Sequence, residues 1–65
     1  MNVFINQQST ELPAPACVQD ALAILAPTPP FAVAVNTVFV PRAQYATHPL
    51  QDGDHIEVIA PVTGG

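Results

Sequence analysis

The chain has 65 residues and a formal net charge of -4, with five acidic side chains, one arginine and no lysine. A single basic side chain cannot neutralise a run of phosphates or hold a protein to an anionic membrane, so binding to nucleic acid or to a membrane surface is excluded. One small domain is expected, because a chain this short has no residues for a second core, and its 49 % hydrophobic content excludes disorder.

Alternation of apolar and polar residues over 1–6 predicts a first strand, with Val3 and Ile5 on one face. The polar residues 7–9 suit a hairpin connection, and a returning strand is expected over 10–12, where prolines then end it. The first two elements should therefore form an antiparallel hairpin.

A short helix is predicted over 18–26, because apolar residues recur at helical spacing and Pro27 prevents further continuation. Cys17 is an unfavourable N-cap, whereas Asp20 in the first turn complements the positive end of the helix dipole. The expected buried face consists of Val18, Ala21, Leu22 and Leu25. Ile24 falls outside that face.

Three further strands are expected in the second half of the chain, over 31–35, 38–40 and 55–59. Residues 42–50 read as an irregular connection, and Asp52-Gly53-Asp54 is a strong turn signal. The charge-free run 21–41 is long enough to cross a bilayer, but its prolines break it, so it is interpreted as a helix end, a turn and strands. One helix among five strands fits an α+β sheet with the helix on one face.

The expected domain spans residues 1–59, and residues 60–65 are predicted to form a flexible tail. Gly64 and Gly65 lack a Cβ, so such a tail can thread a narrow channel with an unshielded last carbonyl. If Gly65 is the native end, its carboxylate is an anion at neutral pH and reacts with nucleophiles only after activation. The glycines alone leave open a frayed end without a role. The first residues lack a basic segment, so no signal peptide is expected and a cytoplasmic location is predicted.

No group of side chains predicts an enzyme or a metal site. Cys17 is expected to be a small, partly buried apolar side chain rather than a reactive thiol. His48 and His55 lack the spacing of a metal-binding pair, and Asp52 and Asp54 are expected to form a turn in solvent. The chain is therefore predicted not to be an enzyme and to hold no metal or cofactor of its own.

A set of motifs extends along the whole chain: Val35-Asn36, Val40-Pro41-Arg42, Tyr45, Leu50-Gln51-Asp52-Gly53-Asp54, Ile56-Glu57-Val58 and Gly64-Gly65. Together they resemble the ThiS family, the sulfur carrier proteins of thiamine biosynthesis. The resemblance implies a β-grasp, ubiquitin-like fold, in agreement with the order of elements predicted above.

The resemblance also implies a mechanism at the C-terminal glycine. In that family an E1-like adenylyltransferase, ThiF, uses ATP to adenylate this residue, here Gly65, and cysteine-derived sulfur then replaces AMP to leave a thiocarboxylate. Thiazole synthase, ThiG, takes the sulfur into the thiazole ring. Gly64, Thr63 and Val62 would give the tail access to these enzymes.

Two alternatives remain. Segments 47–50 and 60–65 also resemble the small subunit of molybdopterin synthase, a related sulfur carrier, although the chain is short for that subunit. A ubiquitin-like interaction module without sulfur chemistry would have the same fold.

A docking site for the adenylating partner is expected on the outer face of the sheet. The first and last strands of a β-grasp sheet lie side by side, so Phe4 and Ile59 are predicted to sit close together as an exposed apolar patch. The acidic residues 52, 54 and 57 would form a polar rim that steers the chain toward a basic partner. Arg42 is expected either to contact a partner or to pair with a local carboxylate.

Overall fold

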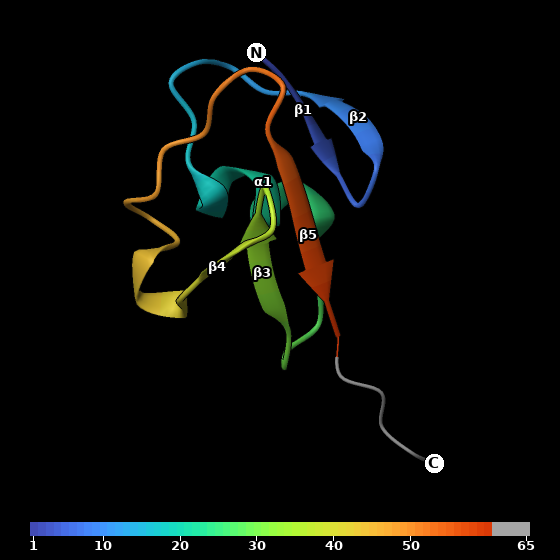
Figure 1. Ribbon diagram of the computed structural model, residues 1–65, viewed down its shortest axis with the longest axis vertical. Coiled ribbons are helices and arrows are strands. Elements are labelled where there is room, and N and C mark those ends of the chain that lie inside the picture. Colours follow the sequence, from blue (N-terminus) through green and yellow to red (C-terminus); the bar gives the residue numbers. More distant parts are fainter. Residues whose placement is uncertain (61–65) are drawn as a thin grey trace.

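The computed structural model describes residues 1–60, in which a five-stranded mixed sheet packs on one helix (Figure 1). The strand order is β2-β1-β5-β3-β4, with β1 and β5 parallel and the other neighbours antiparallel. The elements are β1 (Asn2–Ile5), β2 (Gln8–Glu11), α1 (Val18–Leu25), β3 (Ala32–Val35), β4 (Val38–Val40), the 3₁₀ helix η1 (Arg42–Gln44) and β5 (His55–Ile59). The α+β prediction is confirmed.

The neighbouring strands β1 and β5 come from the two ends of the described chain. β1 and β5 run parallel, with Phe4 opposite His55 and Ile5 opposite Ile56. Parallel neighbours need a long crossover connection, which the helix and the second hairpin supply here. The expectation that the first and last strands lie side by side is therefore confirmed.

Both hairpins turn on two residues with positive φ: Asn6 and Gln7 in the first, Asn36 and Thr37 in the second. Such turns match the twist of the flanking strands, and asparagine tolerates the left-handed region better than most residues. The second turn was predicted correctly. The connection predicted over 7–9 was wrong, because the turn ends at Gln7 and β2 begins at Gln8.

The N-cap of helix α1 is stabilised by a side chain from the first turn of the helix. The Cys17 N–H donates to Asp20 Oδ2 at 2.8 Å, so the acidic side chain compensates for the unfavourable cap. The helix ends where Ala26 adopts a left-handed conformation and donates its N–H to Leu22 O at 2.7 Å. Leu25 is 38 % exposed, contrary to prediction, because it lies over a shallow hollow beside the polar strand β2.

The core lies between α1 and the inner face of the sheet. Its buried side chains are Val3, Ile5, Leu12, Ala16, Val18, Ala21, Leu22, Val33, Val35, Val40, Leu50 and Ile56. Three of these come from connecting segments, and the Leu50 N–H donates to Ala16 O at 2.9 Å to hold two of those segments together. The expected irregular connection is thus part of the core.

Within residues 1–60, no helix has the length and apolar character needed to cross a bilayer. The charge-free run divides into the end of α1, a proline-containing turn, and strands β3 and β4. Its interpretation from the sequence is therefore confirmed.

Candidate functional site

Strand β5 carries the chain to the predicted reactive tail. Its last residue, Ile59, pairs with Ala32 at the start of β3, and the chain leaves the sheet at the end remote from the N-terminus (Figure 1). The predicted tail residues Val62, Thr63, Gly64 and Gly65 lie outside the described residues, so their roles stay predictions. What the structure describes is the surface around this exit.

An apolar surface extends over the outer face of β5, β3 and β4. Ile59 is 56 % exposed and Phe39 is 65 % exposed, and the small side chains of Ala32 and Ala34 lie between their strands in register. An exposed apolar surface of this kind is typical of a partner site. Phe39 was not singled out from the sequence, although its alternation with Val38 and Val40 was a usable signal.

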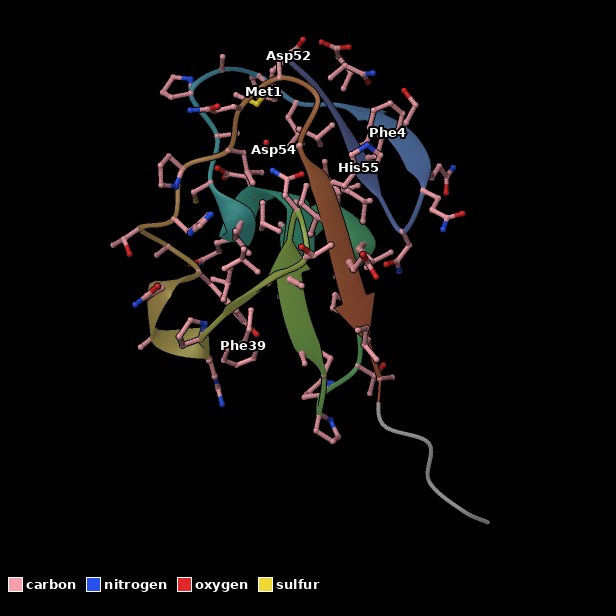
Figure 2. The ribbon with its side chains drawn as sticks, viewed as in Figure 1. Met1, Phe4, Phe39, Asp52, Asp54 and His55 are labelled. Atoms are coloured by element: carbon pink, nitrogen blue, oxygen red, sulfur yellow. The ribbon has the colours of Figure 1, made fainter. Side chains whose placement is uncertain are left out.

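Phe4 lies on the same face but not beside Ile59. Its ring stacks on His55, with ring centroids 4.6 Å apart and planes 15° apart, at the start of β5 (Figure 2). Ile59 is four residues further along that strand, which corresponds to about 13 Å. The prediction that Phe4 and Ile59 sit close together is wrong, because the parallel register of β1 and β5, which alternation cannot reveal, pairs Phe4 with His55.

The acidic turn before β5 is a structural feature. Asp52 Oδ1 accepts the Asn2 N–H at 2.6 Å, while Asp54 accepts the Gln51 N–H at 2.8 Å and Asn36 Nδ2–H at 3.0 Å. Gly53 between them has φ of +89°, which favours glycine. The two aspartates are therefore turn formers, as predicted.

The predicted acidic rim does not form. Asp52 and Asp54 lie at the end of β5 remote from the exit (Figure 2), and only Glu57 lies within the outer face, opposite Ala34. Negative charge is thus separated along the strand rather than gathered around one patch.

A cleft of about 510 Å³ opens next to the exit. It is lined by Pro29, Pro30, Phe31, Arg42 and Tyr45. The rings of Phe31 and Tyr45 stack with centroids 6.2 Å apart and planes 11° apart, which gives the cleft an aromatic wall. A smaller apolar hollow, lined by Pro30, Phe31, Ala32 and Ile59, adjoins it. Because Pro30 and Phe31 line both, the cleft that contains Arg42 and the hollow at Ile59 are neighbours.

Arg42 forms no ion pair with a carboxylate of residues 1–60. The ion pair found in this part of the chain joins the Met1 ammonium group to Glu11, 3.2 Å apart. The alternative that Arg42 pairs with a local carboxylate is therefore not supported, and its place in the cleft agrees with the alternative of a partner contact.

Cys17, His48 and His55 do not form one cluster, although the backbone at Cys17 pairs with that at Pro49, next to His48. Across residues 1–60, no three side chains of histidine, cysteine, aspartate or glutamate are grouped so as to hold a metal ion. The Cys17 backbone N–H, and secondarily its thiol, donates to Asp20 and lowers the pKa of that carboxyl below its usual value of 3.8. Cys17 thus serves the start of α1.

The order of strands, the single helix and the last strand ending beside an apolar surface define a small ubiquitin-like β-grasp protein. The family model of the ThiS family matches residues 2–65, so the chain belongs to the ThiS family. The crystal structure of the thiamine biosynthesis protein ThiS from Geobacter metallireducens is similar, with a TM-score of 0.80, 22 % identity and coverage of 100 % of both chains. This likeness shows a shared fold. Among curated proteins there is no significant match.

Proposed function

We propose that the chain is the sulfur carrier for thiazole formation in thiamine biosynthesis and that it works through the carboxylate of Gly65. The observation that carries the proposal is the ThiS family match, which spans residues 2–65 and so includes the Gly64-Gly65 motif. The same observation favours the thiamine pathway over the molybdopterin pathway. The exposed surface beside the end of β5 supports the proposal, since a carrier needs a face that an activating enzyme can grip near the reactive end.

The proposed chemistry starts from an unreactive anion. A carboxylate oxygen of Gly65 attacks the α-phosphorus of ATP, pyrophosphate leaves, and the product is a mixed anhydride with AMP. A cysteine-derived sulfur nucleophile at the oxidation level of sulfide then attacks the carbonyl carbon, and the C–O bond to AMP breaks. The resulting thiocarboxylate donates its sulfur to the thiazole precursor.

The chain acts in these steps as a co-substrate rather than a catalyst. An E1-like adenylyltransferase, ThiF, would bind the ATP, and thiazole synthase, ThiG, would accept the sulfur. The described carboxylates of Asp20, Asp52 and Asp54 are engaged in hydrogen bonds of the fold, so they serve the fold rather than acid–base chemistry. In this proposal the catalytic groups belong to the partners.

The adenylating partner would dock on the outer face next to the exit, around Ile59. A standard interface covers about 800 Å² on each partner, which is roughly 30 Å across. A footprint of that size centred near Ile59 also reaches Phe4, about 13 Å away along β5, and Phe39 on β4. Phe4 and Ile59 therefore remain proposed contacts of one partner, although they do not touch.

The proposal is tested by the intact mass of the chain after incubation with the adenylyltransferase, ATP and a sulfur source. Replacement of one carboxylate oxygen by sulfur adds about 16 Da. A chain lacking Gly65 is the control, and its mass should not change. An unchanged mass of the wild-type chain, or an equal gain in the control, would contradict the proposal.

A transfer assay separates the two sulfur-carrier pathways. The thiocarboxylate form should support thiazole formation by thiazole synthase, and a strain deleted for the gene should grow only when thiamine is supplied. Sulfur transfer to molybdopterin synthase without transfer to thiazole synthase would instead favour the molybdopterin pathway.

A further inference from the structure

Arg42 is the only basic side chain of the chain, and it lines the cleft next to the exit. No carboxylate of residues 1–60 forms an ion pair with Arg42. The other lining residues, Pro29, Pro30, Phe31 and Tyr45, supply mainly apolar and aromatic surface. The cleft thus offers one planar cation at the side of an apolar wall.

The backbone that carries Arg42 is held in place. Pro41 has φ of −64°, and its carbonyl accepts the Gln44 N–H at 2.9 Å. The Tyr45 N–H donates to Arg42 O at 3.2 Å, and the Tyr45 carbonyl in turn accepts the Gln19 N–H of α1 at 2.9 Å. These bonds tie the 3₁₀ turn to the helix, so the cleft is preorganised rather than formed by a loose loop.

We propose that this cleft binds a carboxylate side chain of the adenylating partner, with an apolar side chain of the same partner segment lying against Phe31 and Tyr45. The inference rests on the proposed function, because it assumes that this partner docks beside the exit. A guanidinium group binds a carboxylate through two parallel N–H bonds, and a single arginine is enough for one such pair.

The charges favour a protein carboxylate over a phosphate group. Phosphates in proteins are held by several donors together, whereas this cleft contains one cation, and the net charge of −4 repels a polyanion. Because Pro30 and Phe31 are shared with the hollow at Ile59, a partner seated on the exit also reaches Arg42. One acidic residue on an otherwise basic partner surface would then fix the orientation of the carrier.

The first test is the affinity for the adenylyltransferase. Arg42→Gln removes the charge and should raise the dissociation constant about tenfold, since hydrogen bonds to charged groups are among the stronger ones. Arg42→Lys keeps the charge and should recover part of that loss. The midpoint of urea denaturation of both variants is measured in parallel, and an unchanged midpoint shows that the fold is intact.

The second test exploits the absence of lysine. Arg42→Lys places the only ε-amino group of the chain in the cleft, and a water-soluble carbodiimide couples an amine to a carboxylate in direct contact with loss of water. The matched control is Gln8→Lys, which puts the same amine on the exposed strand β2. We expect a cross-link from position 42 to an aspartate or glutamate of the adenylyltransferase, identified by peptide mass mapping, and none from position 8.

The outcomes separate this inference from the proposed function. A wild-type chain that gains about 16 Da, with an Arg42→Gln variant of unchanged affinity, would overturn the cleft proposal alone. A cross-link from position 8 but none from position 42 would overturn it as well. Competition by added inorganic phosphate that disappears in Arg42→Gln would replace the carboxylate with a phosphate ligand.

Discussion

Charged side chains have different roles at the two ends of β5. At its start, the carboxylates of Asp52 and Asp54 (Figure 2) accept hydrogen bonds from Asn2, Gln51 and Asn36, so both are engaged within the fold. Beside its end, Arg42 lines an open cleft, and no carboxylate of residues 1–60 pairs with it.

This contrast indicates which charged side chains contribute to folding. A side chain that satisfies a backbone N–H contributes stability, because an unpaired amide is costly, whereas an unpaired surface cation adds little to folding. We therefore expect changes at the start of β5 to alter stability and changes beside its end to alter binding.

The largest effect on stability within this comparison is expected for Asp54→Ala. It removes the acceptor for the Gln51 N–H and for the Asn36 side chain, both hydrogen bonds to a charged group, and should lower the free energy of unfolding by about 2 kcal/mol. Urea denaturation measures the change. Glu57→Ala, at an exposed position of β5, is the control and should change stability by less than about 0.5 kcal/mol. Equal losses of unfolding free energy in the two variants would contradict the view that the hydrogen-bonded carboxylate contributes more to stability than the exposed one.

For Ile59→Ser the expected effect is smaller, and it concerns binding rather than stability. Ile59 is more than half exposed on the outer face, so the variant should keep its stability while the dissociation constant for the adenylyltransferase rises about tenfold. Val38→Ser is the matched control, since Val38 is 64 % exposed but alternates with Phe39 and so faces away from the outer face. Equal affinity in the two variants would remove Ile59 from the binding surface.

The smallest effect concerns Asp20, a third carboxylate that the fold uses. Because hydrogen bonds from Cys17 lower its pKa in the folded state, Asp20 stabilises the protein fully above its unfolded pKa near 3.8, and this contribution is lost as the pH falls through the lower folded value. Asp20→Asn lacks the titrating group. The difference in unfolding free energy between wild type and variant should therefore shrink as denaturation is moved from about pH 7 to about pH 2. A constant difference would show that the charge of Asp20 does not contribute.

Local patterns predicted the elements well and their mutual positions poorly. Ile59 was correctly expected to be exposed on the outer face, and helical spacing correctly placed Val18, Ala21 and Leu22 in the core. The first turn was misplaced because β2 (Gln8–Glu11) is polar throughout, so no alternation of apolar residues marks where the turn ends and the strand begins.

The candidate site was predicted in parts that the sequence could not assemble. Ile59 was expected to contact a partner, and Arg42 was expected either to do so or to pair with a local carboxylate. Nothing local indicates that Pro30 and Phe31 lie between the two residues. Phe4 was assigned to the correct face and the wrong neighbour, since its position along β5 depends on strand register.

The class of fold, the family and the acidic, lysine-free character of the chain could be read from its amino-acid sequence, because they depend on composition, periodicity and motif spacing. Tertiary contacts, in contrast, set which charged side chains accept hydrogen bonds within the chain and which one lines a cleft without an ion pair to residues 1–60. The Asn2 N–H donates to Asp52, and the cleft lined by Arg42 neighbours the hollow at Ile59. Both arrangements bring together residues that are far apart in the chain. Such contacts depend on strand register and on packing between distant segments, which the alternation within a single segment does not specify.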